Sequence, residues 1–362
     1  MGKNLGQRYG LLLVHTYGKT DLFAPVRILR YFEDKDDWLM ANISPQQLEE
    51  LQQAAWQAAQ EGKPQEAHQH AQALIDQGLE IGYQIRVMLF IEDGDLASAL
   101  QLVDEGATRN DQSWSMRVLQ SDVLSMAGEG EQALAALAAA RELPEAQLHW
   151  IQIGEATIYG RMMDMDRALN LLQEVDHPDA INSAIEMQFA LLDTVGRHDL
   201  IIEMAEEDLD ALQPPEDPAD AAVLSRIMTQ VAQAYWYEDE DEDTVEHYLK
   251  MAIAFDRSNP DALYLRRELD HQFSEKSRTF ELSIQGQFRQ EIQEQEAQLI
   301  PFQTRYQVIA DSEEEALEFI SNYESDDISA SNLQIVASQS EPNQDEELKG
   351  VYVVTDLLEA EG

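Results

Sequence analysis

The sequence predicts a mainly α protein, a solenoid of helical hairpins followed by a small α+β domain. Three observations predict it. A small residue recurs every 32 to 35 residues, each time five positions after a turn residue. Apolar residues on both sides of each turn recur every three or four positions, as in amphipathic helices. After about Thr279, apolar and polar residues alternate instead, which is typical of half-buried strands.

The repeat runs from Gln47 to about Asp270. A period near 34 residues built from two helices indicates stacked helical hairpins. Small residues suit points where helices cross closely, because a larger side chain would push the backbones apart. The turn and marker pairs are Gly62 with Ala67, Gly94 with Ala99 and Gly128 with Ala133, and two looser pairs follow, Met163 with Ala168 and Gly196 with Ile201.

The last hairpin differs from the others at its entry and at its turn. Three prolines within Gln213–Ala219 exclude a continuous helix and predict a loop. Helix resumes at Asp220 and continues toward Tyr237, and the acidic turn Glu238–Asp243 follows. We expect the partner helix to present Val245 and later apolar residues to its neighbour.

The end of this hairpin carries a family resemblance. Ala252, Asp256, Asn259 and Pro260 occupy the places where a tetratricopeptide repeat (TPR) closes its second helix. Arg257 stands where the family usually has a further proline. The segment therefore resembles a TPR, and the resemblance covers roughly 220 of the 362 residues.

The chain also departs from the family pattern. The aromatic residue of the first helix is mostly absent, and pairs such as Ala54–Ala55 replace the usual Leu-Gly pair. The resemblance implies a right-handed superhelix whose concave face binds another protein or peptide. It brings no catalytic residues with it.

Composition suggests three parts: an N-terminal capping segment (1–44), a TPR-like α-solenoid of about six hairpins (45–272) and a small α+β domain (279–362). Residues 1–44 carry six Lys or Arg and five Asp or Glu, and we expect them to cap the first repeat. Ser44 with Pro45 predicts the first helix start.

The C-terminal domain is expected to combine four strands with a helix. Asp311 or Ser312 would cap the helix, and the acids that follow would face the positive end of its dipole. The expected elements are strands at 280–286, 305–310, 332–337 and 350–355, a helix at 311–320, a short helix at 290–299 and a mobile acidic linker at 338–349.

Charge is the strongest compositional signal. Seventy acidic residues stand against 24 Lys and Arg, giving a net charge of −46. Such a field repels nucleic acid and anionic membranes and attracts basic proteins. Two alternatives stay open: the charge keeps a long exposed solenoid soluble, or it adapts the protein to high salt.

No pattern in the sequence indicates a catalytic or metal site. The chain has no cysteine, and His68 and His70 are two positions apart on a helix, so they point in different directions. The acidic turn lacks the glycine and terminal glutamate of a calcium loop. We expect no enzyme activity and no cofactor, with carboxylates such as Asp311 or Glu313 as the enzymatic alternative. Without a long apolar run near its start, the protein is expected to be cytoplasmic.

The predicted binding face lies on the first helix of each hairpin. Aligning the marker residues places nine side chains there: Gln52, Trp56, Gln84, Met88, Trp150, Ile153, Thr157, Glu186 and Tyr237. Tryptophan and methionine are typical anchors for a partner, and they are equally common in packing between repeats. Lysine and arginine are scarce in this set. That scarcity favours a basic or apolar ligand over a terminal carboxylate.

The sequence thus predicts a non-enzymatic module that binds a basic protein partner in the concave face. A specific form is an inhibitor or immunity protein that blocks a basic toxic enzyme. The alternative is an adaptor or assembly chaperone whose acidity serves only solubility. The sequence does not indicate the oligomeric state.

Overall fold

The structure is a computed structural model that describes residues 45–60, 63–209, 212–215, 217–238, 242–290, 298–324, 328, 333–343, 347–355 and 358–359. The expected N-terminal cap and the role of Ser44 lie outside these ranges. The chain forms two compact units: the first ends at Ala180 and the second begins at Ile181.

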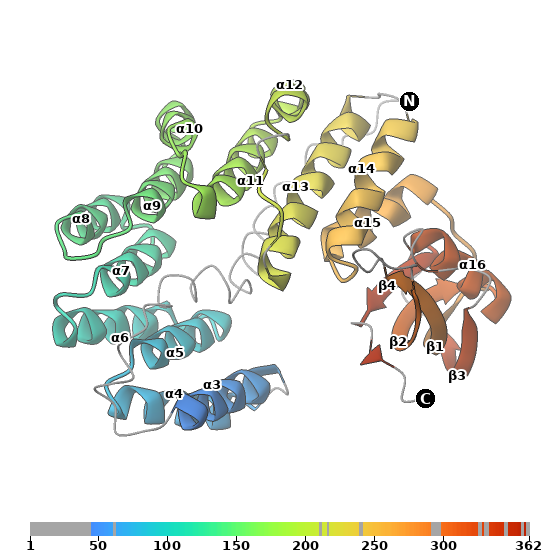
Figure 1. Ribbon diagram of the computed structural model, residues 1–362, viewed down its shortest axis with the longest axis horizontal. Helices are drawn as coiled ribbons and strands as arrows, with labels where there is room; N and C mark the ends of the chain where they lie inside the picture. Colours follow the sequence, from blue (N-terminus) through green and yellow to red (C-terminus); the bar gives the residue numbers. More distant parts are fainter. Residues whose placement is uncertain are drawn as a thin grey trace. The chain divides into compact units, whose positions relative to one another are not determined.

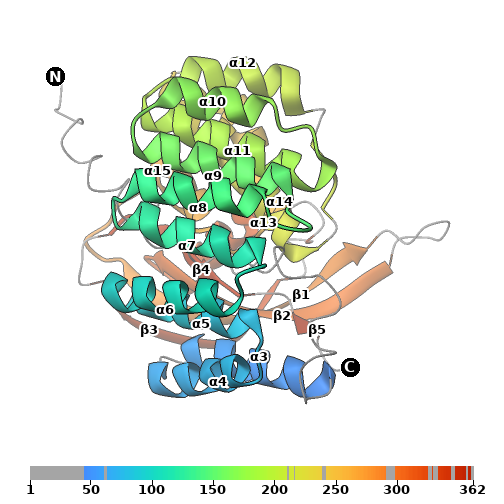
Figure 2. The ribbon, with the colours of Figure 1, turned by 90° about the vertical axis from the view of Figure 1, so that its left-hand side faces the viewer.

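The first unit stacks four helical hairpins, whose members pack pairwise (Figures 1 and 2). This is the TPR-like architecture that the sequence predicts. The helices are α3 (Pro45–Gln60), α4 (Pro64–Asp76), α5 (Glu80–Glu92), α6 (Leu96–Arg109), α7 (Trp114–Met126), α8 (Gly130–Arg141), α9 (Leu148–Arg161) and α10 (Met165–Gln173).

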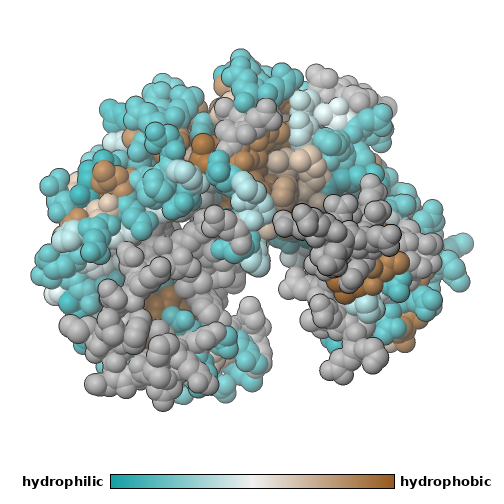
Figure 3. Space-filling model, viewed as in Figure 1, coloured by the Kyte–Doolittle hydropathy of each residue, from teal (hydrophilic) through white to brown (hydrophobic). Residues whose placement is uncertain are grey.

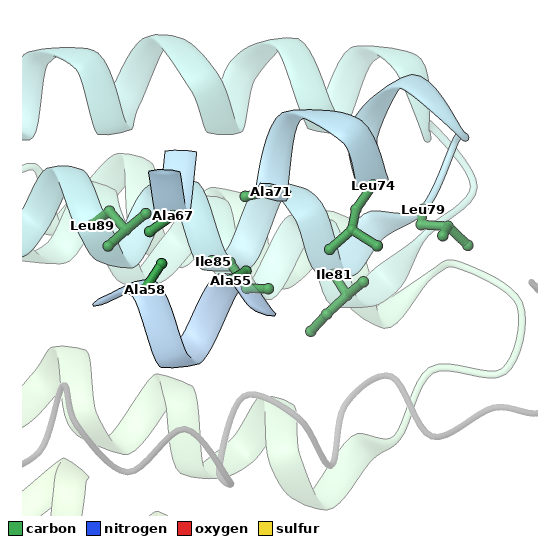
Figure 4. Close-up of a cluster of buried hydrophobic side chains, with 9 residues drawn as sticks. All are labelled: Ala55, Ala58, Ala67, Ala71, Leu74, Leu79, Ile81, Ile85 and Leu89. Carbon is green, nitrogen blue, oxygen red and sulfur yellow. The ribbon is translucent and has the colours of Figure 1, made fainter. Parts of the chain in front are cut away.

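The marker residues form the core of this stack. Ala67, Ala99, Ala133 and Ala168 are all fully buried. Figure 4 shows Ala67 in the cluster that joins α3, α4 and α5, beside small and branched side chains. A larger residue at such a crossing is expected to cost about 1–3 kcal/mol, because packed cores adapt poorly to added volume.

The turn residues have the backbone conformation that their place requires. Gly94 and Gly128 have φ values of 73° and 81°. After α7, the amide of Gly128 donates to the carbonyl of Ser125, and the next amide bonds to Leu124, as in a Schellman ending. Met163 takes the same left-handed conformation, with φ 63°, where the repeat lacks glycine.

The second unit begins with more helices of the same kind. Its helices are α11 (Pro178–Thr194), α12 (His198–Asp208), α13 (Pro218–Tyr237), α14 (Glu242–Phe255) and α15 (Pro260–Asp270). Asn259 caps α15 by accepting hydrogen bonds from the amides of Asp261 and Ala262. Its amide nitrogen donates to Ser225 Oγ (2.8 Å) and Thr229 Oγ1 (3.1 Å) on α13, which ties α15 to α13.

A small antiparallel sheet and one helix complete this unit. The strands are β1 (Arg278–Gln290), β2 (Gln298–Ala310), β3 (Gln334–Pro342), β4 (Gly350–Val354) and β5 (Leu358–Glu359), in the order β3-β1-β2-β4, with β5 also on β2. Helix α16 (Glu313–Tyr323) packs against β2 and β4 and is capped by Ser312, as expected. The predicted α+β class of this part is confirmed.

The bounds of two expected elements in this region differ from the structure. The range 290–299 was expected to be a short helix, but Gln290 ends β1 and Gln298–Leu299 open β2, and 291–297 lie outside the described residues. The expected linker at 338–349 begins too early, because Ser338–Pro342 belong to β3. The pairing of β3 with β1 outweighs the polar composition of Ser338–Pro342.

None of the helices among the described residues is long and apolar enough to cross a membrane. In Figure 3, hydrophilic side chains cover most of the coloured surface.

Candidate partner-binding site

All nine predicted binding residues lie on the first helix of a hairpin, as the alignment of the marker residues predicts. Gln52 and Trp56 are on α3, Gln84 and Met88 on α5, and Glu186 on α11. The side chain of Trp56 is not among the described ones. The remaining four are Trp150, Ile153 and Thr157 on α9 and Tyr237 on α13.

These residues differ in how much solvent they meet. Tyr237 is 38% exposed, and Gln52 and Thr157 are partly exposed. Five are buried, namely Gln84, Met88, Trp150, Ile153 and Glu186. Burial in the free chain does not test whether a residue contacts a partner, so the binding role of these nine residues stays a prediction.

Glu186 has an internal partner. Its Oε1 lies 2.6 Å from Nε of Arg226 on α13, and the Glu186 side chain is 6% exposed. A buried carboxylate needs such a charged donor to offset its lost hydration. The pair therefore fastens α11 to α13.

A second polar cluster surrounds Tyr237 at the end of α13. Nε2 of His198 lies 3.1 Å from Oδ1 of Asp193, and its Nδ1 lies 3.9 Å from Oε1 of Glu238. The imidazole stacks on the Tyr237 ring, with 4.6 Å between centroids. Burial raises the pKa of Asp193, and the His198 charge partly opposes that effect. The cluster therefore combines the Tyr237 ring with an imidazole that two acids contact.

Asp122 on α7 is a residue that the sequence analysis missed. Burial raises the pKa of this carboxyl to about 6, and the charge of Arg161 only partly opposes the rise. Counting eleven positions back from each marker alanine gives Trp56, Met88, Asp122 and Thr157. Three of these are in the predicted set, so the repeat register was the signal that pointed to Asp122.

Arg257 explains one departure from the family pattern. Its Nη2 donates to Glu324 Oε1 (2.5 Å) and to the Tyr306 hydroxyl (2.7 Å), while its carbonyl accepts from Tyr323. Tyr306 also donates to Glu324, whose side chain is 1% exposed. Burial and the Glu324 charge raise the pKa of Tyr306, so its phenol stays a donor. A proline at this position would lose all side-chain contacts to the sheet.

The second anchor between α15 and the sheet uses Arg267. Its Nη1 donates to the carbonyl of Val351 (2.6 Å), and its guanidinium lies 3.9 Å from the centroid of the Tyr352 ring. The amide of Lys349 bonds to the carbonyl of Gln272 at 2.7 Å. The sheet is thus joined to the last helices by partly buried polar contacts as well as by packing.

Most of the few basic side chains are occupied within the chain. Residues 45–362 hold 65 acids and only 18 Lys or Arg, after subtraction of those in 1–44. In the described ranges, nine of these bases are ion-paired internally: Arg109, Arg141, Arg167, Arg197, Arg226, Lys250, Arg257, Arg266 and Lys349. The groups left for a partner are therefore overwhelmingly acidic.

Among the described residues, no group of three or more His, Asp or Glu side chains could hold a metal ion. His68 packs instead on the Phe90 ring, with 4.8 Å between centroids.

Comparison with known proteins gives structural similarity only. No protein-family profile and no curated protein sequence matches the chain. Among solved structures, YrrB, described as a TPR protein with an unusual peptide-binding site, is 16% identical, with a TM-score of 0.30 over 54% of this chain and 96% of that one. A TPR protein from Parabacteroides merdae is 14% identical, with a TM-score of 0.39 over 68% of this chain and 100% of that one.

The TPR domain of P58(IPK) is also similar, at 13% identity and a TM-score of 0.26, over 74% of this chain and 83% of that one. Similarity at this level does not extend to function. The TPR-like character of this chain rests on its own helical hairpins, buried markers and left-handed turns.

Proposed function

We propose that this protein is a binding module that holds a basic protein partner on the first helices of its hairpins and acts without catalysis. The observation that carries the proposal is the charge balance: 65 acids against 18 bases in residues 45–362, with nine of the described bases already paired internally. A basic partner would be steered to this surface over several ångströms.

Anchoring would follow steering. The partly exposed Tyr237 ring would offer a face to a lysine or arginine, with Asp193 and Glu238 nearby on the stacked His198. Such cation–π contacts with nearby acids add about 1–2 kcal/mol when water is displaced. The specific form of the proposal is an inhibitor or immunity protein whose target is a basic toxic enzyme in the same cytoplasm.

Affinity capture at two ionic strengths tests the proposal. The full chain is immobilised and incubated with lysate of its source at about 50 mM and about 500 mM salt, and then each captured protein is purified and its Kd measured over the same range. A single basic partner whose affinity falls steeply with salt supports the proposal. Salt-resistant capture of several neutral or acidic proteins would overturn charge steering and favour the adaptor alternative.

A further inference from the structure

Asp122 differs from the other acids in its surroundings. It lies on α7, on the side that also carries Val118 and Ser125, because residues three and four apart share a helix face. Another side of α7 packs Met116, Leu119 and Val123 into the cluster with α5 and α6. Val118 and Ser125 are buried and Asp122 beside them is partly exposed, on a part of the helix that this cluster does not use.

The Asp122 carboxylate has no internal partner in the part of the chain that the structure describes. No described group donates a hydrogen bond to it, and no described Lys or Arg nitrogen lies within 4 Å. The base whose charge acts on it, Arg161 at the end of α9, donates instead to Ser125 Oγ at 3.0 Å. Most described Lys and Arg side chains likewise have a polar partner within the chain, whereas the Asp122 carboxylate has none among the described residues.

We propose that Asp122 is a binding residue for a cationic group of the partner, the ammonium of a lysine or the guanidinium of an arginine. A partly buried carboxylate gains most from a donor that is itself charged, because charge-assisted hydrogen bonds are about twice as strong as neutral ones. Its register position, shared with Met88 and Thr157, places it in the row where the other predicted contacts lie. The inference rests on the proposed function and names its ligand chemistry.

A labelled deca-lysine peptide provides a defined probe. Its Kd for the full chain is measured by fluorescence anisotropy at fixed low salt for the unaltered protein, Asp122→Asn, Asp122→Glu and Asp111→Asn. Asp111 is an exposed aspartate in the turn before α7, so its substitution removes the same charge from the same unit. Circular dichroism checks that each variant is folded.

We expect Asp122→Asn to weaken binding at least fivefold, Asp111→Asn to weaken it less than twofold, and Asp122→Glu to stay within threefold of the unaltered chain. Equal losses in the two asparagine variants would overturn this inference and leave the proposed function intact. If the unaltered chain does not bind deca-lysine even at low salt, the proposed basic partner is wrong, and the inference falls with it.

Discussion

Replacing Asp122 with asparagine is expected to stabilise the protein at neutral pH. Burial raises the pKa of Asp122 from 3.8 to about 6. A tenfold change in proton affinity is worth about 1.4 kcal/mol, so the ionised carboxylate costs the folded state at most about 3 kcal/mol. The side chain keeps partial solvent contact, which reduces the expected gain to about 1–2 kcal/mol.

The sign of the pH dependence follows from the direction of the shift. The folded chain holds the Asp122 proton more tightly than the unfolded chain, so this contribution to stability is fully present below pH 4. It is lost progressively as the pH rises from about 4 to about 6. Asparagine does not titrate, so the advantage of the variant should be about half of its full value at pH 5 and reach the full value near pH 7.5.

Urea unfolding followed by circular dichroism measures this difference at pH 5.0, 6.0 and 7.5, above the calculated isoelectric point of 4.2. Hydrogen exchange of amides in α7 reports the first unit alone. Asp111→Asn serves as the control and is expected to change stability by less than about 0.5 kcal/mol. An Asp122→Asn variant that is less stable at pH 7.5, or whose difference is the same at every pH, would refute the reasoning.

Three further changes test other parts of the fold. Met163→Gly should raise the free energy of unfolding, measured by urea titration, by about 0.5–1 kcal/mol, because this exposed residue has a left-handed backbone conformation that glycine adopts without strain. Gly128→Ala should lower the free energy of unfolding by about 1 kcal/mol for the same reason. Changes of the opposite sign would contradict this account of the turns. Glu324→Gln should lower the free energy of unfolding by about 3 kcal/mol and speed hydrogen exchange of the β2 amides, because it leaves the buried charge of Arg257 unpaired. Unchanged exchange would show that the Arg257–Glu324 pair does not stabilise β2. Burial, and then the charge of the stacked His177, lower the pKa of His149 below 6.5, so this contribution to stability is present above pH 6.5 and is lost as the pH falls through the lowered pKa. His149→Gln should flatten the pH profile of stability on the acid side, and an unaltered slope would count against this prediction.

The helical repeat could be predicted because its physical requirement is local and recurs. Each hairpin needs a small residue where its helices cross and a residue that tolerates positive φ at its turn. Ala99 and Ala133, and Gly94 and Gly128, meet both needs at fixed spacing. Met163 shows that the spacing survives even where the turn chemistry is lost.

The strand boundaries could not be predicted as well, because an edge strand has no buried face to reveal it. In β3 only Ile335 is partly buried, so Ser338–Pro342 resemble a polar linker. At the two ends of the expected 290–299 helix, Gln290 and Gln298 pair with each other in β1 and β2, and pairing between strands leaves no trace in local composition.

In the candidate site, too, the position of a residue in the repeat could be predicted from the sequence, whereas its neighbours in three dimensions could not. The repeat register placed Met88 and Thr157 on the correct helices, and the same count leads to Asp122. Whether a side chain has a partner depends on neighbours that are distant in sequence. Glu186 is paired with Arg226, while no described residue pairs with Asp122, and this contrast appears only in three dimensions.

The two kinds of acid should therefore act at different stages of binding. Exposed carboxylates attract a basic partner from a distance, and salt screens that attraction with a length of about 8–10 Å. Asp122 acts only at contact, where a partly buried charge is screened less. Salt should mainly lower the association rate, whereas Asp122→Asn should mainly raise the dissociation rate. If both perturbations altered only the association rate, Asp122 would be one more acid in the general field and not a binding residue.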